Sequence, residues 1–107
     1  MVNAQQWLDR KYPQEIRAKV KELNISDKNL EGFLDLTEFV NLEELECYNN
    51  QLSSLDLSGL GELRILDCSD NNLTNLTLSN CTSITYLNAY NNRSFFFRQQ
   101  KSNLYLP

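Results

Sequence analysis

Leucines recur along this chain at a fixed interval of 21 residues. Two separate series keep this interval: Leu34, Leu55 and Leu76, and Leu45, Leu66 and Leu87. A self-similar period of roughly 20 to 50 residues is typical of one short structural unit that is copied and stacked, because a single copy cannot bury its own apolar side chains. The interval therefore predicts a coil of stacked units, an architecture that offers a surface for binding other molecules.

The repeated unit has an 11-residue frame, L-x-x-L-x-L-x-x-N-x-L, in which cysteine or alanine can replace the third leucine. The frame runs over Leu42–Leu52, over Leu63–Leu73, and over Ile84–Ser94, where the last leucine is lost. An earlier unit is weaker because Lys28 stands where asparagine belongs. Its apolar positions are Val20, Leu23, Ile25 and Leu30.

Each frame predicts one short strand with alternating inward and outward side chains. The expected strand cores are Leu23-Asn24-Ile25, Leu45-Glu46-Cys47, Leu66-Asp67-Cys68 and Leu87-Asn88-Ala89. The returning half of each turn carries its own apolar pairs, and Gly59 and Gly61 lie nearby, so we expect extended or turn-like segments there instead of helices. Asn50, Asn71 and Asn92 share the last register, where an inward amide can pair with backbone groups that leave the sheet.

These features resemble a known family. The segment L-E-E-L-E-C-Y-N-N-Q-L-S-S-L-D-L-S, residues 42–58, resembles the 21-residue class of leucine-rich repeats. The leading segment N-A-Q-Q-W-L-D-R-K-Y-P, residues 3–13, is similar to the cap of short repeat proteins from expanded fungal families. The resemblance implies an α/β fold, a short leucine-rich repeat solenoid with about four parallel strands on a concave face and an N-terminal helical cap. For function it implies a protein-recognition scaffold, by analogy alone.

Three regions are expected along the chain: a helical cap at 1–19, about 3.5 leucine-rich repeats at 20–94, and an irregular or truncated tail at 95–107. In the cap, Asn3 can serve as the N-cap, Pro13 can open a second helix, and two apolar groups then face the first repeat. These groups are Ala4, Trp7 and Leu8, and Ile16 with Val20. In the tail, Phe95–Phe97 can either fold back over the last strand or mark a truncated array, and we favour truncation.

Charge is divided unevenly along the chain and limits the partners. Residues 31–94 hold ten Asp/Glu and two Lys/Arg, whereas residues 1–30 hold four and six. An acidic body of this kind repels phosphate backbones, so we expect no nucleic acid binding. No stretch approaches the roughly 18 apolar residues that a membrane span needs, and the basic residues of the cap are interleaved with acidic ones, so we expect no membrane binding.

The three cysteines and the N-terminus suggest a compartment. Cys47, Cys68 and Cys81 cannot all pair within one molecule, and the first two take positions where the repeat usually has leucine. The N-terminus lacks a basic region followed by an apolar run, the pattern of a secretory signal. We therefore expect a cytoplasmic monomer, and we discount the five Asn-x-Ser/Thr sequences at Asn24, Asn72, Asn75, Asn80 and Asn92 as products of polar turns.

Nothing in the sequence predicts catalysis, a cofactor or a metal. The chain contains no histidine, which is the most frequent general base and metal ligand. Cys47 and Cys68 are expected to point inward, where thiols are inert packing groups, although a disulfide between them under oxidising conditions is conceivable. Glu46 and Asp67 share an outward row and could in principle support acid–base chemistry or hold calcium, but a solvated acidic face is the simpler interpretation.

The outward side chains of the expected strands form three rows across the sheet. The rows are Glu22, Glu44, Ile65 and Tyr86; Asn24, Glu46, Asp67 and Asn88; and Ser26, Tyr48, Ser69 and Tyr90. Tyrosine provides large contact area at low entropic cost and is enriched at binding hot spots. We therefore predict a non-catalytic scaffold that binds a basic protein or peptide through Glu44, Glu46, Tyr48, Ile65, Asp67, Tyr86 and Tyr90.

Two alternatives stay open. Tyrosine and glutamate are tolerated on any strand surface, so the rows could lack a partner altogether. The chain could also be a truncated fragment of a longer leucine-rich repeat protein without independent function.

Overall fold

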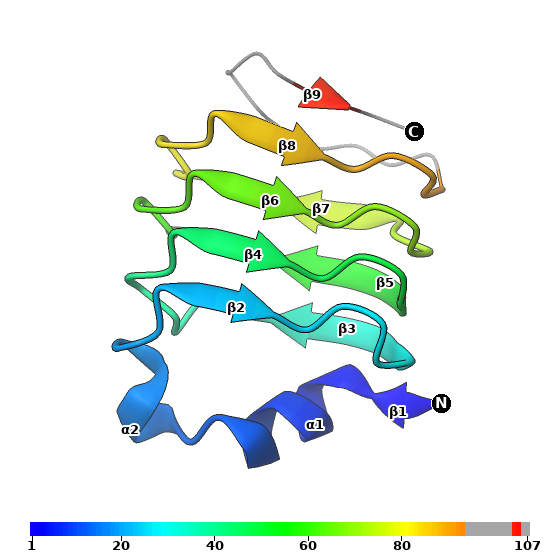
Figure 1. Ribbon diagram of the computed structural model, residues 1–107, viewed down its shortest axis with the longest axis horizontal. Coiled ribbons are helices and arrows are strands. Elements are labelled where there is room, and N and C mark those ends of the chain that lie inside the picture. The colour runs from blue at the N-terminus through cyan, green and yellow to red at the C-terminus, as the bar shows by residue number, and fades with distance from the viewer. Residues whose placement is uncertain (94–103, 106–107) are drawn as a thin grey trace.

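The structure, a computed structural model, describes residues 1–93 and the backbone of residues 104–105. The chain forms an α/β solenoid of about three turns, in which short parallel strands alternate between two sheets (Figure 1). The predicted Phe95–Phe97 cover and the boundary at residue 95 lie outside the described residues.

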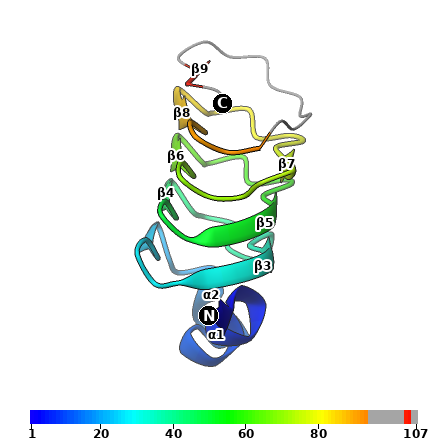
Figure 2. The same cartoon turned by 90° about the vertical axis from the view of Figure 1, so that its right-hand side faces the viewer.

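Two parallel sheets stand on opposite sides of the solenoid (Figure 2). The front sheet consists of β2 (Glu22–Asn24), β4 (Glu44–Glu46), β6 (Ile65–Asp67), β8 (Tyr86–Asn88) and β9 (Leu104–Tyr105). The back sheet consists of β1 (Val2–Asn3), β3 (Leu30–Asp35), β5 (Gln51–Asp56) and β7 (Asn75–Thr77). The four expected strands are therefore present in the front sheet. The returning segments, expected only to be extended or turn-like, form a second parallel sheet, with a register shift between Gly32 and Phe33 where β3 pairs with β5.

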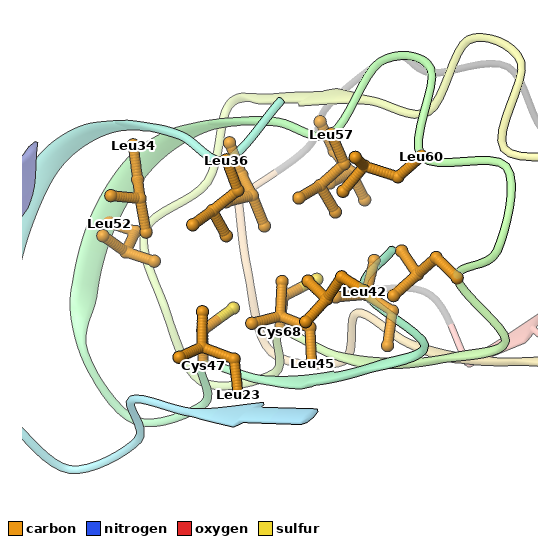
Figure 3. Packing of buried hydrophobic residues seen from close by; sticks show 14 of the residues in the cluster. Leu23, Leu34, Leu36, Leu42, Leu45, Cys47, Leu52, Leu57, Leu60 and Cys68 are labelled. Atoms are coloured by element: carbon orange, nitrogen blue, oxygen red, sulfur yellow. The ribbon is translucent and has the colours of Figure 1, made fainter. Parts of the chain in front are cut away.

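The repeat interval sets the register of both sheets. Leu45 pairs with Leu66, and Leu66 with Leu87, so the front leucines stand in one column. On the other side Leu34 pairs with Leu55 and Leu55 with Leu76. Because the two columns face each other and are buried, they form a single apolar core between the sheets (Figure 3).

The N-terminal cap contains a helix, α1 (Ala4–Lys11), and one further helical turn, α2 (Gln14–Arg17). As predicted, Asn3 is the N-cap of α1, and its Oδ1 accepts a hydrogen bond from the backbone N–H of Gln6 at 2.9 Å. Ala4 and Leu8 are buried against the first coil. The strand β1, which the sequence did not predict, pairs with β3 and joins the cap to the back sheet.

The second half of the cap differs from the prediction. Ile16 was expected to face the core but is 39% exposed, whereas Arg17 is only 6% exposed. The Arg17 guanidinium contacts carboxylate oxygens of Asp9 at 2.9 Å and Glu38 at 3.3 Å, and its Nε donates to the carbonyl of Tyr12 at 2.8 Å. A helix of a single turn has no continuous face, so the spacing of its apolar residues does not decide which side chain points inward.

The predicted asparagine ladder is present and links each coil to the one before it. Asn71 Oδ1 accepts from the N–H of Leu52 at 3.0 Å, and its Nδ2 donates to the carbonyls of Cys47 at 3.0 Å and Cys68 at 3.1 Å. Asn50 and Asn92 make the equivalent contacts one coil earlier and one coil later. Lys28 takes the asparagine position of the first coil, and its backbone N–H donates to Asn50 Oδ1 of the next coil at 3.0 Å.

A second ladder of short polar residues precedes the asparagines and was not predicted. Its members all have left-handed backbone, with φ between 55° and 58°: Asp27, Asn49 and Asp70, followed by Asn91 at 59°. Aspartate and asparagine tolerate this conformation better than other non-glycine residues. In the sequence pairs Asn49-Asn50, Asp70-Asn71 and Asn91-Asn92, the first residue therefore turns the backbone and the second points its amide inward.

Candidate functional site

The front sheet presents the three predicted rows on its outer face. Strand pairing aligns Glu44 with Ile65 and Ile65 with Tyr86 in the first row, and Glu46 with Asp67 in the second. Backbone hydrogen bonds continue the parallel pairing beyond the strand ends, from Asp27 N–H to the Tyr48 carbonyl at 3.2 Å and from Asp70 N–H to the Tyr90 carbonyl at 2.9 Å. All seven predicted binding residues therefore belong to one continuous face.

Their exposure differs from residue to residue. Tyr90 is 64% exposed, and the other six predicted binding residues are half-buried. The serines of the third row were expected to face outward as its tyrosines do, but Ser26 and Ser69 are only 8% and 7% exposed. The third row therefore alternates a buried serine with a more accessible tyrosine. The expectation for the serines was wrong because strand alternation predicts on which side of the sheet a residue lies, but not whether neighbouring side chains cover it.

Most of the second row supports the turns that follow the strands. Asp67 Oδ1 accepts from the Ser69 N–H at 3.1 Å and from its Oγ at 2.7 Å. Asn24 accepts from the Ser26 N–H, and Asn88 from the Tyr90 N–H, both at 3.0 Å. These are Asx turns, in which a short side chain bonds to the backbone two residues later. The spacing of Asp or Asn two residues before Ser or Tyr is a signal in the sequence that could have predicted them.

Glu46 stands apart within this row. Among the described residues its carboxylate has no hydrogen-bonding or ion-pairing partner, whereas Asp67 commits one oxygen to its turn. In the first row, Glu44 Oε2 lies 3.3 Å from Arg64 Nη2, and both side chains are partly exposed to solvent. Solvent-exposed pairs of this kind contribute little stability, typically about 0.2 to 1 kcal/mol.

The face carries one sign of charge. Its three rows contain four carboxylates, on Glu22, Glu44, Glu46 and Asp67, and no lysine or arginine. Arg64, at the edge of the first row, offsets only the charge of Glu44. Carboxylates that line one surface together raise the local concentration of cationic groups and repel anionic ones.

The cysteines lie on the inner side of the coils. Cys47 and Cys68 are completely buried among the core leucines (Figure 3), and Cys81 is 5% exposed. Burial raises the pKa of the Cys47 and Cys68 thiols far above the usual range, and the charge of Asp67 adds to the effect. Burial also raises the pKa of Cys81, whose Sγ donates to the Leu57 carbonyl at 3.0 Å. All three are free thiols, and thiols held neutral in this way are poor nucleophiles.

Within residues 1–93, no group of three or more cysteine, aspartate or glutamate side chains is placed to hold a metal ion. The described helices are also too short and too polar for any of them to cross a membrane. Comparison with protein-family models, with curated proteins and with solved structures finds no significant match to this chain.

Proposed function

We propose that this chain is a leucine-rich repeat interaction module that binds a partner protein or peptide on the outer face of the front sheet. The proposal assigns the contacts to Glu44, Glu46, Tyr48, Ile65, Asp67, Tyr86 and Tyr90. These side chains share one face because strand pairing aligns them.

The observation that carries the proposal is the placement of three tyrosines and an isoleucine on a face that the core does not need. The inner leucines are at most 5% exposed, so the apolar core is closed without Tyr90, which is 64% exposed. The other two tyrosines are half-buried beside it. Aromatic groups that stand together beside carboxylates combine apolar contact area with a charge preference, which is the composition of a binding hot spot.

The proposal is tested by capture of partners from an extract with the purified chain as bait. The test variant is Y48A/Y86A/Y90A, and the matched control is F33A/S54A/N75A, whose three residues form an outward row on the back sheet. We expect the parent and the control to retain the same partner, and the front variant to lose it by at least about 30-fold, the equivalent of one hot spot of 2 kcal/mol.

Tyr48 and Tyr86 are half-buried, so circular dichroism melting must show that the triple variant is folded. Should it not fold, the single variant Y90A decides, because that side chain is the most exposed of the three. Retention of the same partner by a folded front variant, at the affinity of the parent chain, would refute the proposed function.

A further inference from the structure

The third row of the front face has a repeat that spans two coils. Its residues alternate between serine and tyrosine in the order Ser26, Tyr48, Ser69, Tyr90. Neighbouring strands are about 4.8 Å apart, so the backbones that carry Tyr48 and Tyr90 are about 9.6 Å apart, with the short side chain of Ser69 between them. A ligand that runs along this row crosses the strands and meets an aromatic ring at every second strand.

Few chain conformations repeat at that distance. A polyproline II helix repeats every three residues with about 3.1 Å per residue, which gives about 9.3 Å per turn. An extended strand places side chains on one side at about 6.6 Å, and an α-helix advances about 5.4 Å or 10.8 Å over one or two turns. The polyproline II repeat is therefore the closest match to the tyrosine spacing, and proline-rich segments in this conformation commonly dock against aromatic side chains.

The neighbouring row selects the charge of the ligand. Glu46 and Asp67 are paired across β4 and β6, one row away from Tyr48 and Ser69. The Glu46 carboxylate has no side-chain partner among the described residues, and Lys and Arg are absent from the three rows. An anionic segment would meet repulsion here, whereas the planar guanidinium of arginine can bridge two carboxylates on adjacent strands.

Resting on the proposed function, we propose that the occupant of this face is a cationic, proline-rich segment in the polyproline II conformation. Its prolines lie against Tyr48 and Tyr90 above Ser69, and its arginine side chains bind Glu46 and Asp67. The segment runs along the axis of the solenoid, across the strands.

The test is isothermal titration of the full chain with synthetic peptides of four Arg-Pro-Pro repeats. Three matched peptides separate the elements of the proposal. Glu-Pro-Pro repeats keep the conformation and reverse the charge, Arg-Gly-Ser repeats keep the charge and lose the conformation, and an alanine-rich peptide with the same number of arginines is helical. We expect the Arg-Pro-Pro peptide to bind at least ten-fold more tightly than each of the three.

Two double variants identify the contacts. Y48S/Y90S removes both aromatic rings of the third row, so that each coil has serine at this position. E46Q/D67N removes two charges, while the amide oxygen introduced in the second change can keep the turn, as Asn24 and Asn88 do in their own coils. Each double variant is expected to weaken Arg-Pro-Pro binding at least ten-fold, and the loss in E46Q/D67N should be smaller at high salt, where charge attraction is screened. The back-sheet variant F33A/S54A/N75A should bind as the parent does.

Three outcomes would overturn the inference: equal binding of the flexible Arg-Gly-Ser peptide, tighter binding of the helical peptide, or no binding of the Arg-Pro-Pro peptide by the parent chain. Should Y48S/Y90S fail to fold, Y90S provides the same comparison at the most exposed tyrosine. The inference and the proposed function can be told apart. If no proline-rich peptide binds but Y48A/Y86A/Y90A loses a partner that the parent chain captures, the inference is wrong and the proposed function is still supported.

Discussion

The front and back sheets share one core and differ on their outer faces. Inside, both are columns of completely or almost completely buried leucines in parallel register. Outside, the back sheet carries mainly small polar groups, among them Ser54, Asn75, Asp56 and Thr77, with Phe33 as the exception at 50% exposure. The front face has small polar residues of its own, Asn24, Asp67 and Asn88, and adds glutamates, three tyrosines and an isoleucine.

The difference shows which residues the fold requires. Both sheets pair in parallel with different outer side chains, so parallel pairing alone does not require large outer residues on the front sheet. The outer aspartates of the back sheet do have a structural task, because Asp35 and Asp56 each accept two hydrogen bonds from the turn that follows. Among the front tyrosines, Tyr90 is the most open to solvent, at 64% exposure, so the proposed binding role is clearest there.

The largest expected effect tests whether the inner columns are equivalent. L66A in the front column and L55A in the back column should each lower the free energy of unfolding by about 2 to 5 kcal/mol, through lost apolar contacts and the remaining cavity. Urea unfolding measures both. A cost below about 1 kcal/mol for either variant would show that its column is not part of a close-packed core.

The buried thiols of Cys47 and Cys68, which follow the front strands, predict that stability falls at alkaline pH. Burial raises the pKa of Cys47 and Cys68 above the ordinary value of 9.0, so the folded chain keeps both thiols protonated while the unfolded chain releases their protons above that pH. These two thiols therefore do not change the free energy of unfolding below about pH 8. As the pH rises past 9, each thiol lowers that free energy, by about 1.4 kcal/mol at pH 10.

Urea unfolding near pH 8 and near pH 10 measures this loss. The matched control is C47A/C68A, since Ala89 already occupies the same column in the next coil. The control should lose about 3 kcal/mol less than the parent between the two pH values. Equal losses in the two proteins would show that the thiols do not remain protonated in the fold.

The asparagine ladder predicts a smaller but specific effect. N71A removes the amide that reaches the carbonyls of Cys47 and Cys68, so it should cost about 1 to 3 kcal/mol. The neighbouring N72A is the matched control, since Asn72 is exposed and its change should stay within about 0.5 kcal/mol. If the two variants unfolded at the same urea concentration, the asparagine ladder would not contribute to stability as proposed.

The smallest predicted effect compares two serines of the third row. Ser69 Oγ donates to Asp67 at 2.7 Å, whereas the buried Ser26 Oγ has no hydrogen-bonding partner among the described residues. S69A should therefore cost about 1 kcal/mol, and S26A should be neutral or slightly stabilising. Thermal unfolding of the pair would contradict this assignment if S26A were the less stable of the two.

The sequence predicted the columns well, because a constant interval fixes which residues pair in a stacked coil. It predicted the ladder of Asn50, Asn71 and Asn92, and the shared face of the proposed binding residues, for the same reason. It did not predict the second sheet, since strand preference in short polar segments depends on neighbours that the sequence does not identify. It also missed the inward Arg17, because three favourable contacts to Asp9, Glu38 and Tyr12 outweigh the polarity that argued for exposure.

The central claim is that the tyrosines on the outer face of the front sheet contribute more to binding a partner than to folding. It is tested most directly by measuring urea unfolding and partner affinity on the same preparations of Y48A/Y86A/Y90A and F33A/S54A/N75A. We predict that both triple variants unfold within about 2 kcal/mol of the parent, less than the loss of one core leucine, and that only the front variant loses its partner. A front variant that unfolds several kcal/mol more easily, or a back variant that loses the partner equally, would contradict the claim.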